Sequence, residues 1–222
     1  MRESELPLLV IGNKNYSSWS LRPWLLLRHS GVPFRELKLP LDTPQFEARI
    51  GDYAPNRRVP ALHDGEIRLW DSLAICEYAN ERWLDGRGWP ADLAMRALAR
   101  SISAEMHSGF TALRNELPFN CRKRAPLRQV SVEAAAEIER VLAIWRETRR
   151  AHGAAGSFLF GTFGIADAMY APVVLRFIGH GVTLDAETQR YADSITALPA
   201  LREWLAEAST EELSDVHERM KP

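Results

Sequence analysis

Serine side chains gather where the sequence predicts that a strand gives way to a helix. Residues 17–20 read Ser-Ser-Trp-Ser and follow an apolar run at residues 8–11, which Gly12 ends. The first N–H groups of a helix have no partner within it, and the helix dipole is positive there, so this position favours an anion. A hydroxyl of Ser17 or Ser18 could therefore stabilise a thiolate. The alternative is that these serines only cap a helix, which is their commoner role.

A proline marks a second candidate site, at the start of an apolar strand. If the Val59–Pro60 peptide bond is cis, it turns the main chain of Val59 outward. The N–H and C=O of Val59 can then pair with an extended peptide ligand. An edge-strand proline without any ligand is the alternative.

The third candidate site is Asp71–Ser72, at the start of another predicted helix. The Ser72 hydroxyl and the unpaired N–H groups behind it could receive a carboxylate. The Asp71 carboxylate could accept an ammonium group beside it, and an amino-acid head group presents both charges. Helix capping alone also explains both residues.

The elements that must position these residues can be read from the hydrophobic pattern. The first expected elements are a strand at 8–11, a helix from the cap Ser20 to Gly31 with Pro23 in its first turn, and a strand at 34–39. A weak helix at 44–53 follows. The last elements are a hairpin of strands 59–63 and 67–70 around the turn Asp64-Gly65, and a helix from Ser72 to about Leu84. This order is βαβαββα, and its short first βαβ unit indicates a parallel pair of strands.

The pattern changes after residues 85–90, which read Asp-Gly-Arg-Gly-Trp-Pro. Strand signals disappear beyond this segment, so we expect one domain at 1–85 and an all-helical second domain at 91–222. The helices of the second domain are predicted at 91–117, 131–152, 165–178, 185–198 and 199–208.

Composition limits the class of protein. The chain has 222 residues, of which 46% are hydrophobic and 26% charged, with a net charge of -1, so we expect a globular protein rather than a disordered or nucleic-acid-binding one. Cys76 and Cys121 lie too far apart for a CxxC pair or a metal-ligand cluster, and two cysteines make no disulfide framework. The chain has no apolar run of about 18 residues, and residues 1–10 carry Arg2, Glu3 and Glu5 rather than a basic start followed by an apolar stretch. We therefore expect no membrane span, no secretion signal and a cytoplasmic location.

The three candidate sites within one βαβαββα unit resemble the cytosolic glutathione transferase superfamily. Its first domain is α/β and thioredoxin-like, and its second is all-α. Residues 17–22, 56–62 and 71–72 carry the resemblance. The first segment is similar to the Ser-Ser-Cys-Ser-x-Arg signature of the zeta class, with Trp19 in place of the cysteine. The resemblance implies an enzyme that binds reduced glutathione, stabilises its thiolate and directs it at a small electrophile, with glutathione as co-substrate and no metal.

The resemblance also implies roles for individual residues. Ser17 is the expected catalytic hydroxyl, with Ser18 as the alternative. The expected glutathione-binding residues are Ser18, Trp19, Arg58, Val59, Pro60, Asp71 and Ser72. In this assignment Val59 pairs with the cysteinyl main chain, Asp71 and Ser72 take the γ-glutamyl end, and Arg58 meets the glycyl carboxylate or is solvated.

Two segments of the second domain are assigned in the same way. The first long helix is expected to line the electrophile pocket through Met106, His107, Phe110 and Arg114. The alternatives are a structural histidine and ordinary core packing for Met106 and Phe110. Gly164 to Asp167 resembles the capping box of a buried helix, in which Asp167 is a stability residue.

Other functions stay open at this point. Trp19 departs from the zeta signature and puts a maleylacetoacetate isomerase activity in doubt. A disulfide reductase or peroxidase activity is possible, since the reactive sulfur belongs to the ligand. A non-catalytic binding protein with this fold is another alternative. A glutaredoxin-like oxidoreductase would need a cysteine where residues 17–20 have none. The family resemblance implies a homodimer, and no nucleic-acid or membrane partner is expected.

Overall fold

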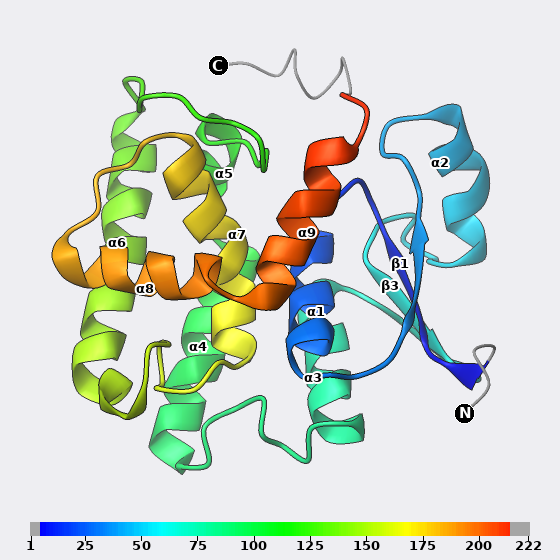
Figure 1. Ribbon diagram of the computed structural model, residues 1–222, viewed down its shortest axis with the longest axis horizontal. Helices are drawn as coiled ribbons and strands as arrows, with labels where there is room; N and C mark the ends of the chain where they lie inside the picture. Colours follow the sequence, from blue (N-terminus) through cyan, green and yellow to red (C-terminus); the bar gives the residue numbers. More distant parts are fainter. Residues whose placement is uncertain (1–4, 214–222) are drawn as a thin grey trace.

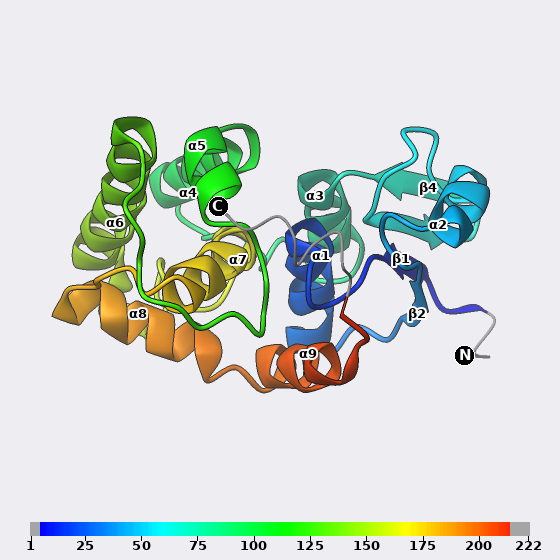
Figure 2. The ribbon, with the colours of Figure 1, turned by 90° about the horizontal axis from the view of Figure 1, so that it is seen from above.

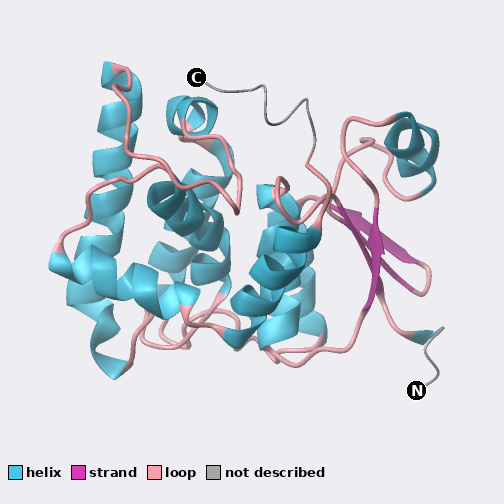
Figure 3. Ribbon diagram, turned by 45° about the horizontal axis from the view of Figure 1, so that its top comes forward, coloured by secondary structure: helices cyan, strands magenta, loops and turns pink. Residues whose placement is uncertain are grey.

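The computed structural model describes residues 5–213, and its first part is a four-stranded mixed sheet (Figures 1 and 3). The strands are β1 (Leu8–Ile11), β2 (Arg35–Lys38), β3 (Ala61–Asp64) and β4 (Ile67–Trp70), in the spatial order β2-β1-β3-β4. β1 and β2 are parallel, whereas β3 is antiparallel to both β1 and β4. The predicted parallel pair and the predicted hairpin are therefore both confirmed.

Helices cover both faces of this sheet. α1 (Ser18–His29) and α3 (Ser72–Arg82) lie on one face, and the short α2 (Pro44–Arg49) lies on the other (Figure 1). Because side chains alternate along a strand, Leu9 contributes to the large core beneath α1 and α3, while Val10 packs in a smaller core with α2. The predicted order βαβαββα is confirmed.

The rest of the described chain is helical. Its helices are α4 (Leu93–Ser108), α5 (Thr111–Glu116), α6 (Val132–His152), α7 (Ile165–Gly179), α8 (Ala186–Thr196) and α9 (Pro199–Thr210). α7 is buried along almost its whole length, because it packs between α1 and the other helices (Figure 2). The first four residues of the expected domain 1–85 and the last nine of the domain 91–222 lie outside the described residues.

Two predicted helix boundaries are wrong. The helix predicted at 91–117 is two helices, because Phe110 takes the left-handed conformation with φ 59°. Gly109 is needed before it, since a Cβ there would lie 2.8 Å from the carbonyl oxygen of Glu105. The N-cap of α1 is Ser17 rather than Ser20, which sits inside the first turn with Pro23 further along the helix. Every serine in this segment can cap a helix, so tertiary contacts choose between them.

Candidate functional site

The start of α1 is the centre of the candidate site. The Ser17 hydroxyl caps the helix by accepting from the main-chain nitrogen of Ser20 at 3.3 Å, and it donates to Ser20 Oγ at 2.7 Å. Ser20 Oγ also accepts from the nitrogen of Gly12 at 3.1 Å, which ties the end of β1 to α1. No acidic side chain lies in the first turn, so the helix's own first turn does not neutralise its positive end.

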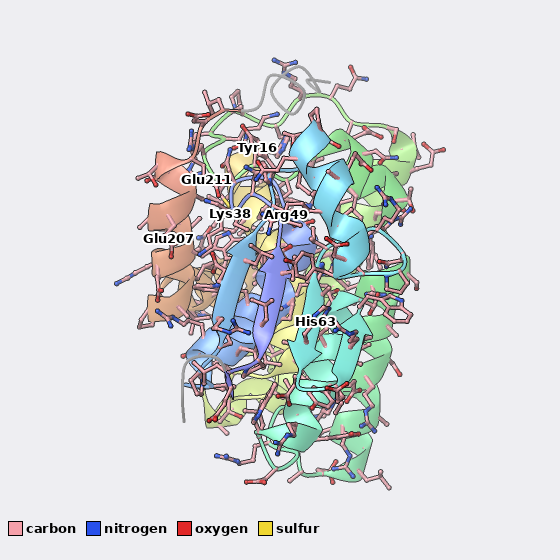
Figure 4. All side chains as sticks on the ribbon, turned by 90° about the vertical axis from the view of Figure 1, so that its right-hand side faces the viewer. Tyr16, Lys38, Arg49, His63, Glu207 and Glu211 are labelled. Carbon is pink, nitrogen blue, oxygen red and sulfur yellow. The ribbon has the colours of Figure 1, made fainter. Side chains whose placement is uncertain are left out.

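The residue that caps the C-terminus of α9, Glu211, holds the loop that precedes Ser17. The Glu211 carboxylate accepts from the main-chain nitrogens of Lys14 at 2.9 Å and Asn15 at 3.0 Å, and it pairs with Lys38 Nζ at 2.8 Å. Figure 4 shows Glu211 beside Lys38 and close to Tyr16. The sequence analysis missed this contact, because it joins residues almost 200 positions apart.

Lys14 is buried in the same loop, with 1% of its side chain exposed. Its ammonium group pairs with Glu36 at 2.9 Å and with Glu207 at 2.7 Å. The rings of Trp24 and Trp204 lie 4.7 and 5.4 Å from the same nitrogen. A buried charge needs partners of this kind, so the loop is fixed from several sides.

The Val59–Pro60 peptide bond is cis, as the sequence interpretation of this segment requires. Val59 is partly buried, and Pro60 is buried just before β3 begins. Among residues 5–213, none of the main-chain hydrogen bonds outside helices and strands involves Val59. The Arg58 side chain is exposed, while its main-chain nitrogen donates to Asn56 Oδ1 at 3.1 Å.

Asp71 caps α3 and also joins it to α4. One carboxylate oxygen accepts from the nitrogens of Leu73 and Ala74, and the other lies 2.9 Å from His107 Nε2. Burial alone would raise the pKa of Asp71, but hydrogen bonds from His107 and the two main-chain donors outweigh it and lower the pKa. Ser72 is buried, and its hydroxyl accepts from Arg22 Nη1 at 3.4 Å.

Trp19 lies among cationic side chains between α1 and α4. The guanidinium carbons of Arg22 and Arg114 lie 4.3 and 4.6 Å from its ring centroid, and the His107 ring meets it edge-on at 5.3 Å. Arg114 is oriented by hydrogen bonds to the carbonyl oxygens of Met106 and His107 at the end of α4.

A third arginine reaches this region from α7. Arg176 Nη2 donates to Ser18 Oγ at 3.3 Å, and Nη1 donates to the carbonyl oxygens of Leu117 and Arg114. Burial, followed by repulsion from the neighbouring arginines, lowers the pKa of Arg22 and of Arg176 to about 9. We call Arg22, Arg114 and Arg176 the arginine cluster.

The arginine cluster has no carboxylate partner at ion-pair distance among residues 5–213. In addition, Arg22 Nε is buried without a hydrogen-bond partner. Arg22 and Arg176 were not predicted as site residues. The available signal was Arg176, a lone arginine in the apolar sequence of α7. An arginine is seldom buried without a specific role.

The structure thus brings most of the predicted residues together. Side chains from the start of α1, the start of α3, the end of α4 and α5 lie in one set connected through the arginine cluster, namely Ser18, Trp19, Asp71, Ser72, His107 and Arg114. Ser17 precedes Ser18 in the chain, and its side chain bonds to Ser20. Arg58 is exposed, and its hydrogen bond to Asn56 does not join it to this set. Met106 and Phe110 are 1% and 6% exposed and belong to the apolar core, which agrees with the alternative of core packing.

Neither cysteine lies at the start of α1. Cys76 and Cys121 are both free and buried, and burial raises the pKa of each, that of Cys121 to about 12. A thiol of that kind is a poor nucleophile near neutral pH. Residues 5–213 contain no cluster of side chains suited to a metal ion, and none of their helices combines the length and apolarity needed to span a bilayer.

Comparison with known proteins gives matches on both halves of the chain. Residues 16–82 match the family model described as glutathione S-transferase, N-terminal domain, and residues 97–207 match glutathione S-transferase, C-terminal domain. Glutathione S-transferase theta-3 of Mus musculus is 34% identical over 41% of this chain and 38% of its own length. Maleylacetoacetate isomerase of Rattus norvegicus is 33% identical over 49% of this chain and 51% of its own. The chain therefore spans about half, or less, of the length of these curated relatives.

Solved structures share the fold over nearly the whole chain. A glutathione transferase homolog from Burkholderia with bound glutathione has a TM-score of 0.70 at 23% identity, covering 93% of this chain and 100% of that one. The unclassified glutathione S-transferase 2 from Bombyx mori has a TM-score of 0.74 at 17% identity, covering 98% and 99%. At these identities the likeness establishes the fold alone.

Proposed function

The chain belongs to the glutathione S-transferase family, and from this membership we propose that it binds reduced glutathione and directs the thiolate at a small electrophile. The observation that carries the proposal is the start of α1, where the Ser17 hydroxyl caps the helix and the arginine cluster contacts the next two residues, Ser18 and Trp19. A free thiol has a pKa of about 8.5, so only a few per cent is ionised near pH 7. A position of this kind favours the ionised form of a bound thiol.

Ser17 is our choice for the hydroxyl that meets the sulfur. It caps the helix, so its oxygen lies at the positive end of the dipole. Ser18 is the competing choice, because Arg176 donates to its oxygen and leaves its own hydrogen free for the sulfur.

The remaining parts of glutathione have partners on the same side of the first domain. The cysteinyl main chain would pair with Val59, after the cis bond to Pro60. The γ-glutamyl carboxylate would meet the start of α3 at Ser72, and its ammonium group would join the Asp71 oxygen that now contacts His107. The exposed Arg58 would be available to the glycyl carboxylate.

Calorimetry with reduced glutathione tests the binding half of this proposal. We expect saturable heat at millimolar glutathione or below, and the same protein should conjugate a model electrophile such as 1-chloro-2,4-dinitrobenzene. Absence of both heat and saturation at millimolar glutathione would refute the proposal. Binding without turnover of any electrophile would identify a non-catalytic binding protein instead.

The arginine cluster favours an electrophile that carries a negative charge. Maleylacetoacetate, on which some of the relatives act according to their names, bears carboxylates, so a glutathione-dependent isomerase is the second candidate function. Trp19 stands where the zeta signature has cysteine. A panel of electrophiles that includes maleylacetoacetate and organic hydroperoxides would separate transferase, isomerase and peroxidase activities.

We also propose a homodimer. Ile67 and Trp70 on β4 are each 44% exposed, and Leu93 at the start of α4 is 73% exposed. Contact between one subunit's first domain and the other's second would cover these apolar side chains. Light scattering at micromolar concentration should give twice the mass of 25.1 kDa, and a single-chain mass would contradict the dimer.

A cytoplasmic location agrees with two free, buried cysteines, because thiols persist in reducing compartments. Cell fractionation of the native protein tests this assignment.

A further inference from the structure

The Ser17 and Ser20 hydroxyls form one hydrogen bond with each other, in which either oxygen can be the donor. Ser17 Oγ donates to Ser20 Oγ at 2.7 Å, and this bond is buried, since Ser17 is 5% exposed and Ser20 is 0% exposed. A hydroxyl has one hydrogen to donate and two lone pairs to accept with. In the arrangement in which Ser17 donates to Ser20, Ser17 has no hydrogen for a sulfur atom.

Ser20 is placed to take over as the donor. Its oxygen accepts from the nitrogen of Gly12 at 3.1 Å, and this bond does not depend on where the Ser20 hydrogen points. Gly12 packs tightly against Leu41, because a Cβ at this residue would lie 2.8 to 2.9 Å from Leu41 Cγ, Cδ1 and Cδ2. The main-chain donor is thus fixed on one side of Ser20, and the Ser17 hydroxyl lies on the other.

We propose, on the premise that the chain binds glutathione as described above, that Ser20 is a positioning residue that reverses its hydrogen bond with Ser17 when the thiolate is present. In the reversed pair Ser20 donates to Ser17, and Ser17 donates to the sulfur. The relay runs from Gly12 N–H through Ser20 Oγ and Ser17 Oγ to the thiolate.

The reversal loses no hydrogen bond. Gly12 still donates to Ser20, the nitrogen of Ser20 still donates to Ser17, and one bond between the two hydroxyls is kept with its direction exchanged. The bond from Ser17 to sulfur is then a net gain. Because each donor in a chain polarises the next, a Ser17 hydroxyl that accepts from Ser20 is a stronger donor than an isolated one. Burial keeps water from replacing Ser20 in this role.

A purely structural role for Ser20 makes a different prediction. If the side chain only ties Gly12 to α1, its loss lowers the melting temperature and leaves the acidity of the bound thiol unchanged. The pKa of the glutathione thiol in the complex is therefore the readout that separates the two roles.

The test compares Ser20→Ala, Ser17→Ala and the double variant by titrating the ultraviolet absorbance of the bound thiolate. Loss of one supporting hydrogen bond in Ser20→Ala should raise the pKa of the bound thiol by up to about one, which is up to about a tenfold loss of thiolate below that pKa. Ser17→Ala should raise it further. The double variant should match Ser17→Ala, because Ser20 acts only through Ser17. At a pH below the pKa of the bound thiol, where glutathione binds as the protonated thiol, its dissociation constant from calorimetry should stay within about threefold.

Ser103→Ala is the matched control, since Ser103 is a fully buried serine on α4 outside the relay. It should leave the titration unchanged. If Ser20→Ala fails to fold, Ser20→Thr and Ser20→Val give a pair of similar shape with and without the hydroxyl, and only Ser20→Thr should keep the acidity of the bound thiol.

The outcomes distinguish this inference from the proposed function. An unchanged titration in Ser20→Ala, beside a raised pKa in Ser17→Ala, would overturn the relay alone. The relay would also be overturned if Ser20→Ala and Ser17→Ala raised the pKa of the bound thiol by equal amounts and the double variant raised it by their sum. Absence of glutathione binding by the wild-type protein would overturn both the relay and the function on which it rests.

Discussion

His107 Nε2 lies 2.9 Å from Asp71 Oδ2, so the helix that ends the first domain is capped by a carboxylate that the second domain also holds. Three hydrogen bonds thus converge on Asp71, two from the first turn of α3 and one from α4. The residue takes a positive φ of 83°, a conformation that is uncommon outside glycine. Asp71 therefore caps α3 and also connects α3 to α4 through His107.

Asp71→Ala should therefore lower the free energy of unfolding by about 1 to 2 kcal/mol at pH 7, the usual effect of losing an N-cap. The pKa of Asp71 is lowered from its ordinary 3.8, so its contribution is present above that value and is lost as the pH falls through the folded-state pKa. Urea denaturation at pH 7 and pH 3 should show the difference between variant and wild type shrinking in acid. A constant difference would contradict this account.

Glu211→Ala should loosen the loop before Ser17. It removes the acceptor of two main-chain N–H groups and the partner of Lys38, with 4% of the Glu211 side chain exposed. We expect a loss of about 2 kcal/mol in stability, because buried donors are left unsatisfied. Both kcat/KM and the melting temperature should fall, whereas the exposed neighbour Glu212→Ala should change neither. Wild-type behaviour of Glu211→Ala would show that α9 does not hold this loop.

Asp167→Asn should change how stability depends on pH. Burial raises the pKa of Asp167 to about 6 in spite of hydrogen bonds from the nitrogens of Leu159 and Gly164. The pKa of Asp167 in the folded protein exceeds the ordinary 3.8, so protonation of Asp167 adds to the free energy of unfolding. This contribution is fully present below pH 3.8 and is lost as the pH rises through 6. Wild type should lose stability between pH 4.5 and pH 6.5 relative to Asp167→Asn. Parallel curves in urea denaturation would contradict the raised pKa.

Asp167→Ala, in contrast, removes the acceptor altogether. It should lower the melting temperature without selectively removing thiol activation, since Asp167 caps α7 through the nitrogen of Gly164, apart from the candidate site. A stable Asp167→Ala variant that no longer binds glutathione would refute its assignment as a stability residue.

Arg114→Gln should weaken a preference for anionic electrophiles. The matched pair 4-chloro-3-nitrobenzoate and 4-chloro-3-nitrobenzamide differs in charge and little in shape. We expect Arg114→Gln to lower the ratio of kcat/KM for the benzoate to kcat/KM for the benzamide by about tenfold, because the variant loses one hydrogen bond to a charged group. Arg150→Gln, which removes an exposed arginine on α6, should leave the ratio unchanged. Equal use of both electrophiles by the wild-type protein would show that the arginine cluster does not select charge.

Ser17→Ala and Ser18→Ala decide which hydroxyl meets the sulfur. Ser17→Ala should raise the pKa of bound glutathione, while Ser18→Ala should leave it near the wild-type value and disturb only the contact with Arg176. Ultraviolet titration of both complexes checks this. The reverse result would transfer the catalytic role to Ser18.

Local sequence patterns were sufficient for most of the fold. Alternating or continuous apolar runs predicted all four strands, and Asp64-Gly65 predicted the turn between β3 and β4. Boundaries failed at Ser20 and at Phe110, where the sequence allowed more than one cap and where a left-handed residue interrupts a continuous helical pattern. Sequence also identified the starts of α1 and α3 as candidate sites, since capping residues and apolar patterns are local.

Sequence alone thus determined which residue types stand at the start of each helix, and hence the class of chemistry open to them. Only the tertiary structure decided which groups each hydroxyl pairs with and which charges surround Trp19. Arg114 and Arg176 reach Trp19 and Ser18 from distant helices, and Glu211 reaches the loop before Ser17 from α9. Electrostatic and hydrogen-bond energies depend on distances of a few ångströms, and packing between distant segments sets those distances.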